Sequence, residues 1–321
     1  MVKALKRPLR NWKFGIPGIL LLILIGGLLF FAPSSWASRQ DAITSEGTFS
    51  FFLPLVQSKT HNVIWLSHEE ISQLPMSGAA WEQVKEAADK KMDTPDLSDQ
   101  DEDANVQTLA KALVYARTND VTYRDEVVEA LRVITYNNTE NGGRTLALGR
   151  KLAAYVIAAD IIGLGGFDSA LDMDFRRKIS ELRTKKLDGN TLISTNEDRP
   201  NNWGTHAGAS RVAVALYLDD RADLDRAASV FKGWMGDRSV YAGFKYDDDL
   251  SWQCDPSKPV GINAQGCTKE GHSIDGAQPE EMRRGGPFTW PPIETVYPWE
   301  GLQGAVVTAE MLRRNGYENS W

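Results

Sequence analysis

The chain has 321 residues, with 36 Lys and Arg against 43 Asp and Glu, and therefore a formal net charge of −7. This charge argues against nucleic acid as a partner, because such partners are bound through clustered cations. No glycine-rich phosphate loop links a strand to a helix, and His68-Glu69-Glu70 departs from the HExxH zinc motif. We therefore expect no nucleotide, no metal and no cofactor.

Residues 1–37 are typical of an export signal. Basic residues precede an apolar run over roughly residues 15–31, and Ser35-Trp36-Ala37 offers a small-x-small cleavage site. An uncleaved N-terminal membrane anchor is the alternative, because the apolar run is close to the length that spans a bilayer. In either case residues 38–321 form the exported body, periplasmic or secreted, and their length fits one domain with a large core.

Apolar residues at helical spacing predict a series of helices from about residue 80 onward. The ranges are 104–117, 123–136, 146–162, 172–186, 205–218, 222–235 and 300–314. Residues 48–75 have a mixed pattern and are expected to wrap around the outside. The acidic segment 96–103 is expected to be a solvated loop, with a calcium loop as the weaker alternative because the EF-hand spacing is absent.

Short links between the predicted helices favour antiparallel hairpins. We expect an all-α fold, an incomplete (α/α) toroid of antiparallel helical hairpins in which residues 237–297 form a long rim loop. An open solenoid is the alternative, but the sequence lacks a clean 34-residue period. The last helix has no predicted return partner. We therefore expect a C-terminally incomplete sequence, with an uncovered apolar face on Leu302, Val306, Ala309 and Leu312.

Cys254 and Cys267 are the only cysteines, and both lie in the predicted rim loop. An oxidising compartment favours a disulfide between them, and two free thiols are the alternative. Two cysteines without CxxC spacing make a zinc site improbable.

The segment from Asn201 to Arg211 concentrates polar and aromatic side chains where an apolar helix begins. Such groups are costly to bury unless a ligand or a hydrogen-bond network satisfies them. Asn202, with Asn201, would donate to a carboxylate near the positive end of the helix, and plain helix capping by asparagine is the competing interpretation. Trp203 would stack on a sugar ring or fill the core. Arg211 is assigned to substrate binding.

Two histidines are candidates for proton transfer. His206 lies four residues after Asn202 and therefore on the same helix face, where it would act as a base or help to neutralise a carboxylate. His272 lies in the rim loop, and an ordinary loop histidine paired with Asp275 explains it equally well.

A phenol and two guanidinium groups follow. Tyr297 would take and return a proton if nearby cations stabilise its phenolate. Arg283 and Arg284 offer such cations and bidentate contacts with a carboxylate. Neighbouring arginines usually point in different directions, so only one of them is expected inside the site. Arg284 is assigned to catalysis, and Arg283 and Trp290 are assigned to substrate binding.

These residues suit β-elimination of a 4-linked uronate polysaccharide. Neutralising the carboxylate acidifies the C5 proton, a base removes this proton, and an acid protonates the leaving oxygen. The net negative charge of the chain would repel such a polymer in bulk, so that a locally basic cleft is required.

The motifs Asn201-Asn202-Trp203-Gly204, His272-Ser273-Ile274-Asp275-Gly276 and Arg283-Arg284-Gly285-Gly286, with residues 297–304, resemble the alginate lyase superfamily. The resemblance covers about residues 80–320, so that residues 38–321 would form one alginate-lyase-like domain. It implies an α/α toroid, a periplasmic setting and an acidic polysaccharide as substrate.

The resemblance also implies roles for individual residues. Asn202 would neutralise the carboxylate, His206 or His272 and one of the two arginines would assist, and Tyr297 would transfer the proton. The best-known lyases of this fold place a histidine directly after the second asparagine, where this chain has Trp203. The base and the polymer (alginate, glucuronan or another polyuronate) therefore stay open. Family members also continue past the point where this chain stops.

Two other function classes are compatible with the sequence. A glycoside hydrolase on the same fold needs two carboxylates across the cleft, and the candidates are Asp275, Glu280, Glu281, Glu294 and Glu300. A non-catalytic, exported sugar-binding protein would depend on its tryptophans but not on Tyr297. Elimination leaves a conjugated double bond that absorbs ultraviolet light, and neither alternative does.

Overall fold

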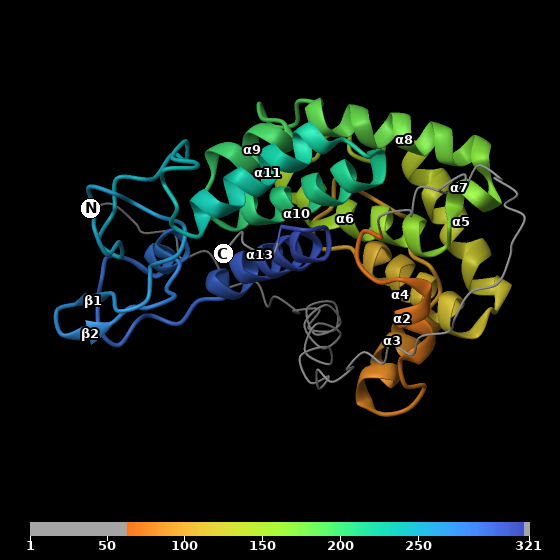
Figure 1. Cartoon of the computed structure of the whole chain (residues 1–321), viewed down its shortest axis with the longest axis horizontal. Helices are drawn as coiled ribbons and strands as arrows, with labels where there is room; N and C mark the ends of the chain where they lie inside the picture. Colours follow the sequence, from red (N-terminus) through yellow and green to blue (C-terminus); the bar gives the residue numbers. More distant parts are fainter. Residues whose placement is uncertain (1–62, 318–321) are drawn as a thin grey trace, which may run out of the picture.

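The computed structural model describes residues 63–317 (Figure 1). The predicted signal peptide or anchor, residues 1–37, lies outside the described residues. Within residues 63–317 the chain is mostly helical, and the only named strands are β1 (Thr268–Lys269) and β2 (His272–Ser273), which form one antiparallel hairpin. The expected all-α class is confirmed. In this part of the chain no helix is both long and apolar enough to cross a membrane.

The helix bounds agree with the predicted periodicity to within a few residues. In chain order the helices are α2 (His68–Gln73), α3 (Ala79–Asp89), α4 (Ala104–Thr118), α5 (Val121–Tyr136), α6 (Thr145–Ile161), α7 (Leu164–Phe167), α8 (Ser169–Thr184), α9 (Leu192–Asp198), α10 (Asn202–Leu218), α11 (Arg221–Trp234), α12 (Pro279–Met282) and α13 (Tyr297–Arg314), and a 3-10 turn, η2 (Arg283–Gly285), follows α12.

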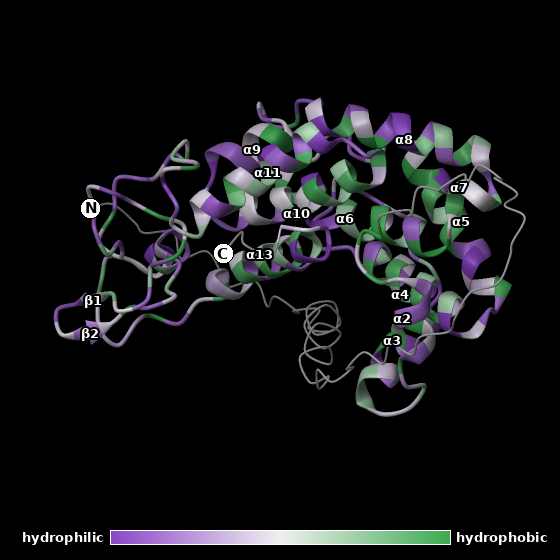
Figure 2. Cartoon of the chain, in the orientation of Figure 1, coloured by the Kyte–Doolittle hydropathy of each residue, from purple (hydrophilic) through white to green (hydrophobic). Residues whose placement is uncertain are grey.

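The helices form an inner and an outer series. In the inner series α4 packs on α6, α6 on α10, and α10 on α13. In the outer series α3 and α5 pack on α4, α8 packs on α5, and α11 packs on α10. Figure 1 shows the two series following one curved path. The inner helices α6 and α10 are buried nearly all round, whereas outer helices such as α8 alternate polar and apolar residues (Figure 2).

Two glycines allow the inner helices to approach closely. A Cβ atom on Gly149 of α6 would lie 2.9 Å from the backbone nitrogen of Ala207 on α10. A Cβ atom on Gly304 of α13 would lie 2.4 Å from the backbone nitrogen of His206, which is also on α10. Both separations are shorter than van der Waals contact, so that any larger residue would push the helices apart. The first turns of α10 are therefore enclosed by α6 and α13.

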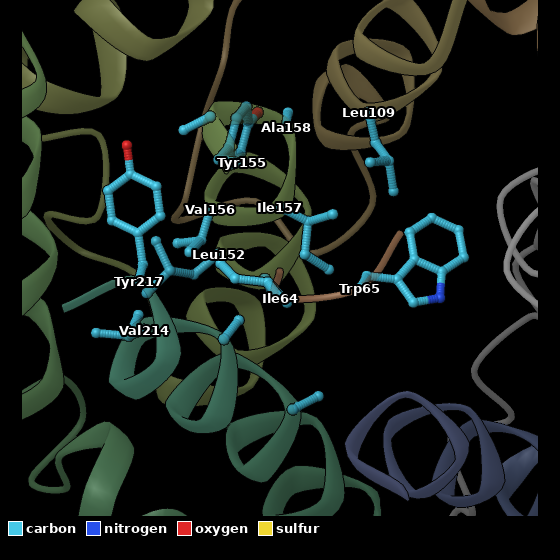
Figure 3. Close-up of a cluster of buried hydrophobic side chains, with 14 of the residues drawn as sticks. Ile64, Trp65, Leu109, Leu152, Tyr155, Val156, Ile157, Ala158, Val214 and Tyr217 are labelled. Atoms are coloured by element: carbon cyan, nitrogen blue, oxygen red, sulfur yellow. The ribbon is translucent and has the colours of Figure 1, made fainter. Parts of the chain in front are cut away.

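The expectation that residues 48–75 wrap around the outside is wrong for residues 64–66, which are buried in the core. Ile64 and Trp65 lie among side chains of α6 and α10 (Figure 3). The Ile64 amide donates to Asp160 Oδ2 at 3.0 Å, and the side-chain amide of Asn315, just after α13, donates to the carbonyl of Val63 at 3.3 Å. Burial of this apolar run is favourable because its backbone groups find partners.

The expectation of an uncovered α13 holds only in part. The helix packs on α10 and, near its end, on the first described segment, where Arg314 pairs with Glu70 at 2.7 Å. Leu312 is fully buried, whereas Val306 remains 43% exposed. The long loop before α13 is held by the predicted disulfide between Cys254 and Cys267, which the structure confirms.

Candidate functional site

The predicted asparagine pair opens α10, as expected. Asn201 is the N-cap residue, and its side-chain oxygen accepts a hydrogen bond from the Trp203 amide at 3.2 Å. Asn202 is the first helical residue and is only 2% exposed. Its side-chain nitrogen donates to Glu300 Oε2 on α13 at 2.7 Å, and its backbone amide donates to Glu281 Oε1 on α12. Asn201 therefore caps the helix, and Asn202 connects three helices.

Glu281 occupies the position where a substrate carboxylate was expected. Its side chain is buried against the start of α10, and Oε2 has no hydrogen-bond partner among the described residues. Burial raises the pKa of this carboxyl to about 7, with Glu300 and Glu280 adding to the shift, while the Asn202 amide and Arg284 oppose it. The α10 terminus therefore already carries an anionic group that is partly protonated near neutral pH.

Glu300 is held in a different electrostatic environment. Its Oε2 atom lies 2.6 Å from the guanidinium of Arg150 on α6 and also accepts the hydrogen bond from Asn202. This ion pair fixes the position of the Glu300 carboxyl and thereby the orientation of the asparagine amide. Arg150, Asn202 and Glu300 thus join the three inner helices α6, α10 and α13.

His206 lies in the same cluster but is buried. Desolvation, with the charge of Arg150 as a further cause, lowers its pKa to about 3, and a hydrogen bond with the Glu300 backbone opposes this shift. Nε2 of the imidazole has no partner among the described residues. The ring is therefore neutral at physiological pH, so that it does not supply positive charge to a substrate carboxylate.

Tyr297 and Arg284 lie beside each other at the beginning of α13. The guanidinium carbon of Arg284 is 4.6 Å from the centre of the Tyr297 ring. Tyr297 is half-buried and Arg284 is exposed, so that both can be reached from solvent. Tyr297 lies three residues before Glu300 on α13, and residues at this spacing are neighbours on a helix surface. Of the two, Glu300 is the one that contacts Asn202.

Two arginines without a predicted role lie close to the ring of Trp203. The guanidinium carbons of Arg199 and Arg144 lie 4.3 Å and 5.4 Å from the centre of the indole ring. The ring is half-buried at the outer surface of the α10 terminus. Trp203 therefore does not fill the core, and a positively charged aromatic surface adjoins the asparagine pair.

Two predicted residues, Arg211 and Arg283, have their side chains engaged with carboxylates. Arg211 is fully buried on the other side of α10, where it pairs with Asp223 at 2.7 Å and Glu197 at 3.0 Å. Arg283 pairs with Glu280 at 2.8 Å and Asp247 at 3.0 Å, so that of the two arginines only Arg284 contacts Tyr297. Substrate binding by Arg211 is therefore wrong, because its guanidinium is satisfied inside the protein.

His272 and Trp290 form a separate pair in the long loop. Their rings stack with centres 4.5 Å apart, and Trp290 is 48% exposed. His272 lies in strand β2, in the hairpin that extends away from the helices (Figure 1). The alternative pairing of His272 with Asp275 is not observed. Of the two predicted histidines, only His206 belongs to the cluster around Asn202.

Two cavities found in residues 63–317 lie away from this cluster. One, of about 840 Å³, is lined by residues of α5, α7 and α8, among them Arg132 and Phe167. The other, of about 390 Å³, lies between residues 94–98 and 133–141. Neither includes a predicted site residue.

Glu281 and Arg150 belong to the cluster around Asn202, although neither of them was assigned a role in the predicted elimination. Glu281 was only one of five carboxylates considered for hydrolysis, and Arg150 was not considered. The available signal for Arg150 was its position, beside Lys151, inside the mostly apolar range 146–162. Comparison of the chain with family models, curated proteins and solved structures finds no match.

Proposed function

We propose that this protein is a polysaccharide lyase that cleaves a 4-linked, uronate-containing polysaccharide, alginate or a related polyuronate, by β-elimination. One observation carries the proposal: Asn202 and the segment from Glu281 to Glu300, far apart in sequence, meet at one end of α10 and α13. Asn202 contacts Glu281 and Glu300 directly, and Arg284 covers the ring of Tyr297. The resemblance to the alginate lyase superfamily is part of the same proposal.

The arrangement suggests how the work is divided. Tyr297 begins the step as a phenolate, which the cation of Arg284 stabilises. It accepts the C5 proton and becomes a neutral phenol, and it then gives that proton to the departing O4, which restores the phenolate. The Asn202 side-chain nitrogen carries two N–H groups, of which Glu300 takes one. In this proposal the second donates to the uronate carboxylate, for which the substrate must open the contact between α10 and α13, because Asn202 is only 2% exposed in the free protein. Neutral, buried His206 supports the geometry of α10 and α13 and does not act as the base.

The architecture fits this proposal. The inner series α4, α6, α10 and α13 and the outer series α3, α5, α8 and α11 have the arrangement expected of part of an α/α toroid. We propose that the fold is an incomplete toroid and that the loop from residue 237 to residue 296 forms its rim. The export signal predicted for residues 1–37 supports a periplasmic or secreted location, where polysaccharides are accessible.

Absorbance of the conjugated product in the ultraviolet tests the proposal. The exported body is incubated with alginate, glucuronan and a heparin-like polymer. We expect absorbance to rise with at least one of them, and Tyr297→Phe to lower the initial rate by about a hundredfold or more, because the proton acceptor is lost. Asn202→Ala should also lower the rate, through loss of carboxylate neutralisation and of the contact with Glu300.

A matched control is available on the outside of the molecule. Tyr136 is exposed on α5, and its hydroxyl donates to Asp174 at 2.8 Å. Tyr136→Phe should leave the initial rate unchanged. An equal loss of rate in both tyrosine variants, or no absorbance change with any polyuronate, contradicts the proposed elimination.

One observation favours a hydrolase as the second candidate. Glu281 and Glu300 flank Asn202, and their environments differ: burial raises the pKa of Glu281 to about 7, whereas Glu300 is ion-paired with Arg150. Carboxyls in contrasting environments are typical of glycosidases. However, Glu281 is only 1% exposed, which leaves it little access to a glycosidic oxygen. New reducing ends without ultraviolet absorbance would favour hydrolysis.

A further inference from the structure

Two guanidinium groups at one indole form a cationic surface that the proposed elimination chemistry does not use. The guanidinium carbons of Arg199 and Arg144 lie 4.3 Å and 5.4 Å from the centre of the same Trp203 ring. The two positive charges are therefore close to each other. Arg144 comes from the start of α6, and Arg199 from the turn between α9 and α10. Two different parts of the fold therefore bring like charges together.

Neither charge is neutralised by a carboxylate of the described part of the chain. Among residues 63–317, neither Arg144 nor Arg199 forms an ion pair with a carboxylate, although arginines elsewhere in this range commonly do, as Arg211 and Arg226 show. The Arg144 guanidinium donates only to the neutral side chain of Gln100, at 2.9 Å. Cations held close together without a counter-ion repel each other, and an anion bound between them would relieve that repulsion.

The surface formed by Trp203, Arg144 and Arg199 lies next to Asn202, where a neighbouring sugar unit of the substrate would be. Trp203 directly follows Asn202 in the first turn of α10, and Glu300 holds the Asn202 amide on the adjacent side. The accessible part of the half-buried indole offers an apolar contact for a sugar ring, and a planar guanidinium offers paired donors for a carboxylate. Backbone amides of α10 are not available for this purpose, because Glu281 and Asn201 already accept the first two.

We propose that Trp203, Arg144 and Arg199 form a second carboxylate subsite that binds the uronate unit next to the unit cleaved at Tyr297. This inference rests on the proposed function and makes it more specific: the substrate carries acidic units at consecutive positions. It also supplies the local positive charge that an acidic protein needs to bind a polyanion. An isolated uronate between neutral sugars would lose this contact.

Titration calorimetry with a short homo-oligouronate and its carboxyl-reduced, neutral counterpart tests the subsite. We expect the full exported body to bind the acidic oligomer more tightly, and Arg144→Gln and Arg199→Gln each to weaken that binding about tenfold, as expected for loss of one charge-assisted contact. Binding of the neutral oligomer should not change. Arg199→Lys, which keeps the charge but loses the planar fork, should recover part of the affinity.

Arg124→Gln is the matched control. Arg124 also covers an aromatic ring, with its guanidinium carbon 4.0 Å from the centre of Phe167, but it lies on α5 and pairs with Asp125. This variant should bind as the wild type does. Unchanged affinity in Arg144→Gln and Arg199→Gln, or equal binding of the acidic and neutral oligomers, overturns the subsite. Equally tight binding of a short polyphosphate overturns its assignment to uronates.

The test separates the subsite from the proposed activity. If the arginine variants weaken binding while no unsaturated product forms, the subsite stands and the elimination fails. If the wild type produces unsaturated product and the arginine variants keep the wild-type KM, the elimination stands and the subsite fails. Circular dichroism of each variant checks that the fold is intact.

Discussion

Glu281 is the residue whose ionisation most directly affects the stability of the candidate site. Its folded-state pKa of about 7 exceeds the ordinary value of 4.5 because the carboxyl is buried. The folded state therefore binds a proton more tightly than the unfolded state, and stability is lost as the pH rises from about 4.5 to about 7. At higher pH the buried carboxylate destabilises the fold by a constant amount.

Glu281→Gln should remove this pH dependence. The amide oxygen can still accept the Asn202 backbone N–H, and no charge forms. At about 1.4 kcal/mol per pKa unit, we expect the stability of the variant relative to the wild type to rise by roughly 3 kcal/mol between pH 4.5 and pH 7. Urea unfolding across this range measures the difference. A constant difference would show that Glu281 titrates as an ordinary carboxyl.

His206 acts in the opposite direction. Its pKa falls from 6.5 to about 3 on folding, so that the unfolded state binds the proton more tightly and stability is lost as the pH falls below 6.5. His206→Gln removes this loss. The variant should gain about 1.4 kcal/mol relative to the wild type for each pH unit below 6.5. The same urea titrations test it, and a relative stability that falls on acidification would contradict the buried, neutral imidazole.

The opposing shifts explain why both single variants are needed. Between about pH 4.5 and pH 6.5 the Glu281 and His206 contributions nearly cancel in the wild type, and each appears only when the other is removed. The sequence predicted Asn202 and Tyr297 as members of one site, because an amide and a phenol suit the elimination chemistry and because their motifs resemble the alginate lyase superfamily. It could not predict the roles of Glu281 and Arg150, because these arise from contacts between distant parts of the chain.

At the scale of elements, periodicity predicted the long helices well, and the short ones were missed. Helix α2 has a capping box of Ser67 and Glu70, which is a readable local signal. Helix α13 begins at Tyr297, three residues before the predicted start, because Pro298 is tolerated in a first turn. Because of this extra turn, Tyr297 lies on the same helix as Glu300 and, three residues before it, on the same face.

The close approach of α10 and α13 gives a prediction at this scale. Gly304→Ala would place a methyl group 2.4 Å from the His206 backbone nitrogen, so that the helices must separate. We expect a loss of about 1–3 kcal/mol in the free energy of unfolding, as for other overpacked contacts, together with loss of activity. Thermal and urea unfolding measure the first effect.

Gly166→Ala is the control for this substitution. A Cβ atom at Gly166, in the short helix α7, meets nothing within 4 Å. It should leave stability unchanged or raise it slightly, since alanine restricts the unfolded chain. Equal stability of the two alanine variants would contradict the tight helix contact at Gly304.

At the scale of the whole molecule, the all-α class followed from the sequence, because helical spacing recurs along most of the body. The burial of residues 64–66 in the core did not follow from the sequence. Their mixed pattern suggested an outer wrap, yet Ile64 enters the core through hydrogen bonds with Asp160 and Asn315, which come from other parts of the chain. The first described segment thereby packs beside the last helix, and the inner series of helices becomes a rigid support for the Asn202 cluster.

Mass spectrometry of the products formed from a homopolyuronate tests the central claim most directly. Elimination breaks the glycosidic bond without adding water, whereas hydrolysis adds one water molecule. We predict oligomers with an unsaturated end, each lighter by one water than the hydrolysis product, formed by the wild type and by Tyr136→Phe but not by Tyr297→Phe. Products that carry the added water, or unsaturated products still formed at the wild-type rate by Tyr297→Phe, would contradict the account.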